Sequence, residues 1–239
     1  MKNLNNVLCI LSDFNYSAKL IKSLESKDLS IKDLVDFTNK DFKGKGFFEK
    51  ISAKQVFYEI TELANTVKES DPKIIMEIGT YRGGTLFLWC NLNDTVTDVI
   101  SVDLPDNFLT HPYSFVRRIF YKRNFLLNKS KKLFLLPYNS QIKTTRDKVE
   151  DILKDRKIDF LFIDGDHSYK GVQKDFELYL PLMKKGGIIA FHDILPREDV
   201  KEIEVYRLWN ELKQKYKFKE IISADGKFAD TIGIGVIWV

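Results

Sequence analysis

The chain has 239 residues, of which 44% are hydrophobic and 30% charged, and its formal net charge is +4. This composition excludes an intrinsically disordered chain, and no apolar run approaches the roughly 18 residues that a membrane-spanning helix needs. We therefore expect a soluble protein with one large domain, or one domain with a smaller appendage, and no membrane partner.

The cysteines and the N-terminal segment bear on the cellular location of the protein. Cys9 and Cys90 both lie among apolar residues, which predicts buried free thiols rather than a disulfide. The apolar segment 7–11 is short, lacks a small-residue cleavage site and leads into polar residues, so it is a poor signal peptide. These features predict a cytoplasmic location. They leave the oligomeric state open, including a homo-oligomer.

Residues 1–70 are expected to form a helical extension or cap. Segments 17–24 and 31–37 carry apolar residues at helical spacing, and a longer helix is expected to begin at Ser52. Ser52 and Gln55 have the spacing of a capping box, in which the two side chains satisfy backbone groups at a helix start.

Residues 71–239 are expected to form an α/β domain, because short apolar segments alternate with helix-length segments. The expected strands cover 74–78, 98–103, 132–137, 158–164 and 187–193. The expected helices cover 83–92, part of 108–130, 141–155 and 169–184. Another amphipathic helix runs from Val205 to Tyr216, and segments 218–223 and 230–239 flank a turn signal at 224–227. This ending predicts an antiparallel hairpin that completes the sheet.

The loop after the first strand, Glu77 to Gly84, limits the choice of cofactor. It has neither the second glycine of a dinucleotide fingerprint nor the lysine of a P-loop, so NAD, ATP and GTP are disfavoured. A glycine turn preceded by Glu77 remains, with Asp103 at the end of the next strand, where an acid typically binds ribose hydroxyls. S-adenosylmethionine has ribose and adenine but a cationic amino-acid portion instead of phosphates, so it suits this arrangement.

Three segments resemble a known group of enzymes. MEIGTYRGGT (76–85) resembles the first motif of class I S-adenosylmethionine-dependent methyltransferases, and SVDLP (101–105) resembles their ribose-binding strand end. Segment 158–194 resembles the branch that includes macrocin-type sugar O-methyltransferases and cephalosporin-hydroxylase-like proteins. The resemblance covers about residues 73–194. It implies an α/β fold with a Rossmann-like, doubly wound, mostly parallel seven-stranded sheet.

The resemblance also implies which residues bind S-adenosylmethionine. Glu77, Gly79 and Gly83 would line its methionine end, Asp103 would take the ribose, and the loop at 138–140 would contact adenine. The full set of expected cofactor-binding residues is Glu77, Gly79, Thr80, Tyr81, Gly83, Gly84, Asp103, Asn139, Ser140 and Asp164. The alternative for Gly79, Gly83 and Gly84 is tight turning and close helix packing.

Acids and histidines end two strands that are expected to be neighbours. Asp164, Asp166 and His167 follow one strand, while His192 and Asp193 end the other, and such a cluster is typical of a metal site. Catechol-type and macrocin-type O-methyltransferases carry similar ligands, which implies a metal site formed by Asp164, His192 and Asp193. Because those enzymes have an oxygen ligand where His192 stands, imidazole shifts the expected ion from magnesium toward manganese, iron or zinc. The alternative is that the aspartates cap the following helices and His192 bonds the backbone.

The same cluster is the expected catalytic centre. Methyl transfer to an alcohol requires removal of the hydroxyl proton, and a bound cation lowers the pKa of that hydroxyl. By the resemblance, His167 stands where related enzymes can carry a general base, and we expect it to be the base, with Asp166 as its rival and Asp164 beside them. The alternative is that His167 only caps the helix that begins near Ser168. The leading hypothesis is O-methylation of a small sugar-like or anionic acceptor. The alternatives are a non-haem metal oxygenase, an RNA methyltransferase and a cofactor-binding protein without catalysis.

A basic segment lies between Asp106 and Asp147, where no acidic residue occurs. Its cations are Arg117, Arg118, Lys122, Arg123, Lys129, Lys131, Lys132, Lys143 and Arg146. They alternate with the aromatic residues Phe115, Phe120, Tyr121 and Phe125. The segment is either a solvated helix face or a platform for an anionic substrate, which could be a phosphorylated sugar or, less favoured, RNA.

Overall fold

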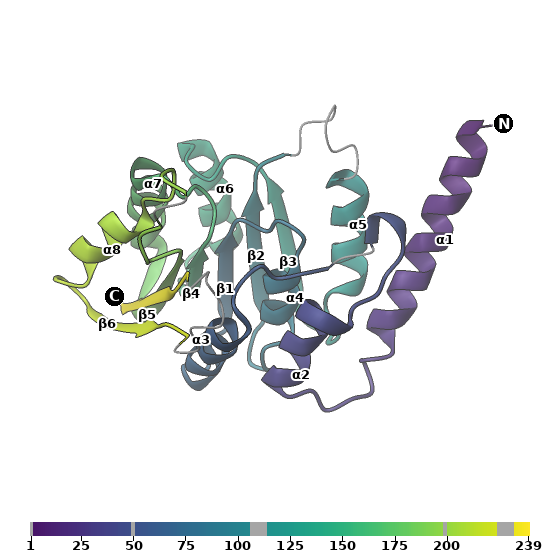
Figure 1. The fold of residues 1–239 in the computed structure, drawn as a ribbon, viewed down its shortest axis with the longest axis horizontal. Helices are drawn as coiled ribbons and strands as arrows, with labels where there is room; N and C mark the ends of the chain where they lie inside the picture. Colours follow the sequence, from purple (N-terminus) through teal and green to yellow (C-terminus); the bar gives the residue numbers. More distant parts are fainter. Residues whose placement is uncertain (1, 49–50, 106–113, 198–199, 224–231) are drawn as a thin grey trace.

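A computed structural model describes residues 2–48, 51–105, 114–197, 200–223 and 232–239. Seven strands form one sheet in the order β3-β2-β1-β4-β5-β7-β6 (Figure 1). Their bounds are β1 Ile74–Ile78, β2 Asp98–Asp103, β3 Lys132–Pro137, β4 Ile158–Ile163, β5 Met183–His192, β6 Lys217–Ile221 and β7 Ile234–Trp238. Strands β1 to β5 pair in parallel, and β7 pairs antiparallel with both β5 and β6. The predicted fold and its C-terminal antiparallel strands are confirmed, although the turn signal at 224–227 lies outside the described residues.

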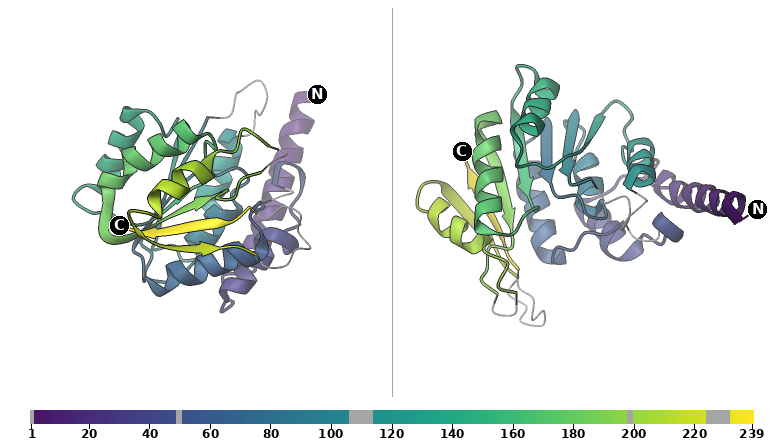
Figure 2. Two further views of the ribbon diagram at one scale, coloured as in Figure 1. Left: turned by 60° about the vertical axis from the view of Figure 1, so that its left-hand side comes forward. Right: turned by 90° about the horizontal axis from the view of Figure 1, so that it is seen from above.

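Helices cover both faces of the sheet, which explains why its central strands are apolar along their whole length. One layer contains α3 Phe57–Glu69, α4 Gly84–Cys90 and α5 Ser114–Asn124. The opposite layer contains α6 Lys143–Leu153, α7 Tyr169–Tyr179 and α8 Val205–Leu212, and Figure 2 shows both layers from two sides. Along β1, Ile75 faces the first layer while Ile74 and Met76 face the second. This alternation is the two-residue period of a strand, in which successive side chains point to opposite faces of the sheet.

The N-terminal extension consists of α1 Lys2–Lys22, α2 Ile31–Asp36, a π-helical turn Phe37–Asp41 and a 3-10 turn Gly46–Phe48. Figure 1 shows α1 beside α5, at the end of the sheet that carries β3. Ile21, Leu34 and Phe48 are almost fully buried and belong to the same apolar cluster as the α4 side of the sheet. The extension and the α/β part therefore share one core. The division at residue 70 stays a prediction.

Two local predictions are wrong. Helix α3 begins at Phe57 with Val56 at its N-cap and no capping side chain, so Ser52 and Gln55 form no capping box. Gln55 instead donates a hydrogen bond to Asp164, a partner 109 residues away that local spacing cannot reveal. Cys9 is exposed, because it lies on α1 at one end of the molecule, whereas Cys90 is buried as expected. Both thiols are free.

Candidate functional site

A cavity of about 640 Å³ lies where the parallel strands β1 to β5 end. The first turn, the loops after β2, β3 and β4, and the end of β5 all contribute to its wall. Of the predicted site residues, those that line it are Gly79, Thr80, Tyr81, Asp103, Asn139, Ser140, Asp164, Asp166, His167, His192 and Asp193. Glu77, Gly83 and Gly84 do not line it. The carboxyl edge of the sheet thus gathers most of the predicted residues, as a doubly wound topology dictates.

Gly79 joins the first turn to the loop after β4. Its φ is +91°, and a Cβ atom there would lie 2.0 Å from the carbonyl oxygen of Asp164. Its N–H donates to the carbonyl of Val102 at 3.0 Å, which fixes the turn against β2. Only glycine tolerates both the left-handed backbone and this contact, so Gly79 leaves the floor of the cavity without a side chain.

Glu77 lies behind the cavity wall and is fully buried. The hydroxyls of Thr85 and Ser101 donate to its two carboxylate oxygens at 3.1 and 3.2 Å. Burial raises the pKa of Glu77 to about 8 despite these hydrogen bonds. In the described structure Glu77 therefore links the end of β1 to Thr85 on α4 and Ser101 on β2.

Gly83 and Gly84 serve turning and packing. Gly83 has φ +77°, and a Cβ atom would lie 2.9 Å from the ring of Tyr121. At Gly84 a Cβ atom would lie 2.0 Å from the backbone nitrogen of Ala53, so the N-terminal extension crosses directly over the start of α4. The packing alternative therefore accounts for these two glycines.

The loops after β2 and β3 are each held by a short-range contact. Asp103 Oδ1 accepts from the N–H of Leu104 at 3.0 Å, and Asn139 Oδ1 accepts from the N–H of Gln141 at 2.8 Å. The Tyr179 hydroxyl donates to the carbonyl of Ser140 at 3.0 Å. These bonds hold Asp103 and Ser140 at the cavity wall, where ribose and adenine were expected.

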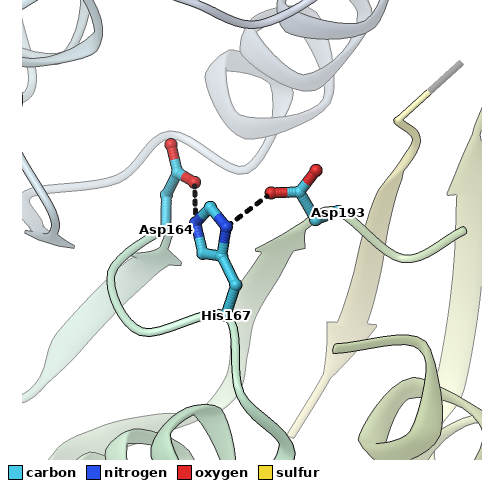
Figure 3. Close-up of side chains that lie close together, drawn as sticks. All are labelled: Asp164, His167 and Asp193. Atoms are coloured by element: carbon cyan, nitrogen blue, oxygen red, sulfur yellow. Dashed lines mark ion pairs between the residues drawn. The ribbon is translucent and has the colours of Figure 1, made fainter. Parts of the chain in front are cut away.

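Asp164, His167 and Asp193 form the centre of the site, and Figure 3 shows the imidazole between the two carboxylates. His167 Nε2 lies 3.4 Å from Asp164 Oδ1, and Nδ1 lies 3.2 Å from Asp193 Oδ2. One potential ligand atom from each residue lies within 4.8 Å of the others, a spacing at which a metal ion could be held. The contact with Asp164 raises the pKa of His167 above its usual value, and Asp193 adds to the effect.

His192 is also next to this cluster but more deeply buried, with 6% of its side chain exposed. Its Nδ1 lies 3.0 Å from Asp164 Oδ1 and 3.2 Å from Asp193 Oδ2, yet neither ring nitrogen has a hydrogen-bond partner among the described residues. Burial lowers the pKa of His192, but the two carboxylates outweigh burial and raise it overall. Burial likewise opposes the ionised form of Asp164, but the two histidines hold its pKa below the usual value.

Asp193 has a left-handed backbone conformation, which is unusual for a residue other than glycine. Its φ is +61°, and Tyr81, which also lines the cavity, has φ +46°. A left-handed conformation costs a residue other than glycine about 1–3 kcal/mol and is concentrated at functional loops. Two such residues in the wall of one cavity indicate that the fold holds these side chains against strain.

Asp166 has partners of its own. Its Oδ2 accepts from Gln141 Nε2 at 2.9 Å, and its Oδ1 accepts from the N–H of Ser168 at 2.9 Å. Partial burial acts against them, but these hydrogen bonds lower the pKa of Asp166 overall. A carboxylate occupied in this way is a weaker base than His167. Ser168, not His167, caps α7, because its hydroxyl accepts from the N–H of Gly171.

Some residues of the predicted basic segment are buried in the core, and others line a cavity. Phe120, Tyr121 and Phe125 are buried in the core, and only Phe115 of the four aromatics is exposed. Lys131 is buried too and donates to the carbonyls of Cys90 and Asn93. The aromatic platform expected for RNA is therefore largely part of the hydrophobic core. Arg117 and Arg118 remain on α5, where they line a small cavity of about 50 Å³ that shares Thr80, Tyr81, Asp103 and Leu104 with the main one.

The sheet order and the cavity at the strand ends are those of a class I S-adenosylmethionine-dependent methyltransferase, and the family match agrees. Residues 76–194, half of the chain, match a family described as "Methyltransferase domain", and the protein belongs to that family. Uncharacterized protein R132 of Acanthamoeba polyphaga mimivirus is 32% identical over 57% of this chain and 58% of its own length. Uncharacterized protein y4gI of Sinorhizobium fredii is 27% identical over 59% of this chain and 15% of its own length. The match thus covers only part of each relative.

Solved structures share the fold over nearly the whole chain. The O-methyltransferase TomG from Streptomyces achromogenes, involved in tomaymycin synthesis and solved in complex with SAM, has a TM-score of 0.57 and 12% identity over 91% of this chain and 92% of its own. The O-methyltransferase from Bacillus cereus, in complex with SAH, has a TM-score of 0.55 and 16% identity over 94% and 99%. No helix among the described residues is long and apolar enough to cross a membrane.

Proposed function

We propose that this enzyme transfers the methyl group of S-adenosylmethionine to a hydroxyl oxygen of a small polyhydroxylated or anionic acceptor, with the help of a divalent cation. The observation that carries the proposal is the cluster of Asp164, His167 and Asp193, which opens into the same cavity as Gly79 and Asp103. The narrower macrocin-type branch is part of this proposal.

The cavity suits the cofactor at two points. Gly79 lines the cavity at the end of β1, where it contributes backbone and no side chain. Asp103 lines the cavity at the end of β2, where a carboxylate can accept from both ribose hydroxyls. Asn139 and Ser140 on the next loop would border the adenine.

The donor set suits a divalent cation. Asp164, Asp193 and His192 would hold it, because His192 Nδ1 lies 3.0 Å from Asp164 Oδ1 and 3.2 Å from Asp193 Oδ2, which brings one nitrogen and two oxygen donors together. Mixed oxygen and nitrogen donors favour manganese or iron over magnesium. When bound, the cation would lower the pKa of an acceptor hydroxyl and orient it.

His167 is the proposed general base. About 36% of its side chain is exposed, unlike that of His192, so an acceptor can reach it. With Nδ1 3.2 Å from Asp193 Oδ2, the carboxylate stabilises the imidazolium, and Nε2 can take the hydroxyl proton. The oxygen–methyl bond then forms as the methyl–sulfur bond breaks. The products are the methyl ether, S-adenosylhomocysteine and protonated His167.

Lysine and arginine side chains around the cavity support the proposal that the acceptor carries a negative charge. Lys54 and Arg197 line the main cavity, and Arg117 and Arg118 line the adjoining one. A phosphate or carboxylate on the acceptor would be attracted to these cations. Within the described part of the basic segment, residues 114–146, no acidic residue occurs.

The proposal is tested by incubating the protein with S-adenosylmethionine labelled in its methyl group and a panel of sugars, sugar phosphates and catechols. We expect labelled methyl ethers, loss of transfer after chelation and recovery with Mn²⁺. Tight cofactor binding without transfer to any acceptor would favour a non-catalytic role. Acceptor oxidation that consumes oxygen and leaves the methyl group in place would favour the oxygenase alternative.

A further inference from the structure

We infer that Gln55, which lies outside the matched methyltransferase segment, is a positioning residue for the Asp164 carboxylate and thereby raises the affinity of the site for a divalent cation. This inference rests on the proposed function. Gln55 precedes α3 and is only 7% exposed, yet it lines the main cavity. Its Nε2 donates to Asp164 Oδ2 at 2.6 Å.

The two carboxylate oxygens of Asp164 have different partners. Oδ2 is taken by Gln55, while Oδ1 lies 3.0 Å from His192 Nδ1 and 3.4 Å from His167 Nε2. The last side-chain torsion of an aspartate is broad and only weakly fixed by its own geometry, so a hydrogen bond to one oxygen sets the direction of the other. The amide therefore keeps Oδ1 directed at the cluster. Because the amide is neutral, it leaves the negative charge of Asp164 available for a cation, whereas a lysine here would neutralise it.

The hydrogen-bond pattern also fixes the orientation of the Gln55 amide. Gln55 Oε1 is buried and has no hydrogen-bond partner among the described residues. Exchanging the amide nitrogen and oxygen would place two acceptors 2.6 Å apart, so the orientation with Nε2 toward Asp164 is the consistent one. A buried, unpaired acceptor costs about 1–3 kcal/mol.

The segment that carries Gln55 is fixed in place. The backbone of Ala53 crosses Gly84 so closely that a Cβ atom there would lie 2.0 Å from its nitrogen. Lys54 Nζ lies 4.7 Å from the centre of the Tyr81 ring, and Ile51 is buried. Gln55 is therefore held at Asp164 by the fold of the N-terminal extension. Residues that orient a metal ligand through a hydrogen bond typically change metal affinity 10- to 100-fold.

The test is calorimetric titration of Mn²⁺ into the metal-stripped full chain. Gln55→Met keeps the side-chain length but removes the donor, and Gln55→Asn keeps an amide that is one methylene too short. We expect both variants to bind Mn²⁺ at least about tenfold more weakly than wild type, with S-adenosylmethionine affinity changed less than about twofold. The matched control is Gln173→Met, because Gln173 Nε2 donates to Glu177 at 3.0 Å on the surface of α7. It should bind Mn²⁺ like wild type.

The possible outcomes distinguish failure of the role of Gln55 from failure of the proposed function. Unchanged Mn²⁺ affinity in a folded Gln55 variant would overturn the role of Gln55 and leave the proposed function standing. If wild type binds S-adenosylmethionine but no Mn²⁺, both the metal assistance and this inference are wrong. If Gln55→Met fails to fold, Gln55→Asn decides, since it buries no new apolar group beside Asp164.

Discussion

His167 Nδ1 lies 3.2 Å from Asp193 Oδ2, and this contact joins the loop after β4 to the end of β5. The same imidazole reaches Asp164 with its other nitrogen. Two roles compete for such a histidine, because an imidazole can either accept a proton or bind a metal ion. The half-buried position of His167 and the buried position of His192 favour a division in which His167 is the base and His192 the ligand.

Replacing His167 should separate these roles. His167→Asn removes the base without adding charge, so we expect turnover to fall about 10²- to 10⁴-fold while Mn²⁺ affinity stays within about threefold of wild type. Initial rates and calorimetric titration on the same preparation measure both. A large loss of Mn²⁺ binding would instead make His167 a ligand, which the cluster of Asp164, His167 and Asp193 also allows.

Gly79→Ala tests the contact between the first turn and the loop after β4. A methyl group would lie 2.0 Å from the Asp164 carbonyl oxygen, so the loops must separate, and we expect a loss of unfolding free energy of about 2 kcal/mol or more. Cofactor binding should weaken too. Gly186→Ala is the control, because it also has positive φ, +77°, but nothing lies within 4 Å of the added carbon. Its cost should be about 1 kcal/mol. Equal losses in urea unfolding would contradict the close contact at Gly79.

Asp175 on α7 should make stability depend on pH. The residue is fully buried and neither carboxylate oxygen has a hydrogen-bond partner among the described residues, and burial raises its pKa to about 6. Between the usual aspartate pKa near 3.8 and pH 6, the folded protein keeps a proton that the unfolded chain releases. The free energy of unfolding therefore falls as pH rises through this window, by about 3 kcal/mol at most.

Asp175→Asn removes this titration, so the variant should be more stable than wild type at pH 7.5, and the gap should narrow toward pH 4.5. Urea unfolding at both values measures it. A gap that is the same at both pH values would show that Asp175 is ionised throughout the range.

Glu59 should hold the base of the C-terminal hairpin. It is buried on α3, and its carboxylate accepts from the N–H groups of Ser223 and Gly233 at 3.2–3.3 Å. Glu59→Ala leaves both donors unpaired, so we expect unfolding free energy to fall by about 1–3 kcal/mol. Glu62→Ala, on the same helix, serves as the control in thermal unfolding. A Glu59 variant as stable as that control would contradict this role.

Local patterns predicted the sheet well, because apolar strands covered on both faces have a continuous signature, as in β1 and β4. They also predicted Asp103, Asp164 and Asp193 at one edge, since parallel strands end together. They could not predict that Gln55 reaches Asp164, because that contact depends on how the N-terminal extension crosses α4. Glu77 was expected to line the cofactor cavity, but whether its side chain faces the cavity or the hydroxyls behind it depends on the path of the turn.

The central claim is that one cavity holds both S-adenosylmethionine and a divalent cation. It is tested most directly by calorimetric titration of the cofactor into metal-stripped protein, and of Mn²⁺ into the same protein, with Asp103→Ala and Asp193→Ala alongside. We predict that Asp103→Ala loses cofactor binding and keeps the Mn²⁺ event, and that Asp193→Ala loses the Mn²⁺ event and keeps cofactor binding. Absence of cofactor binding to the wild-type protein, with and without Mn²⁺, would contradict the account.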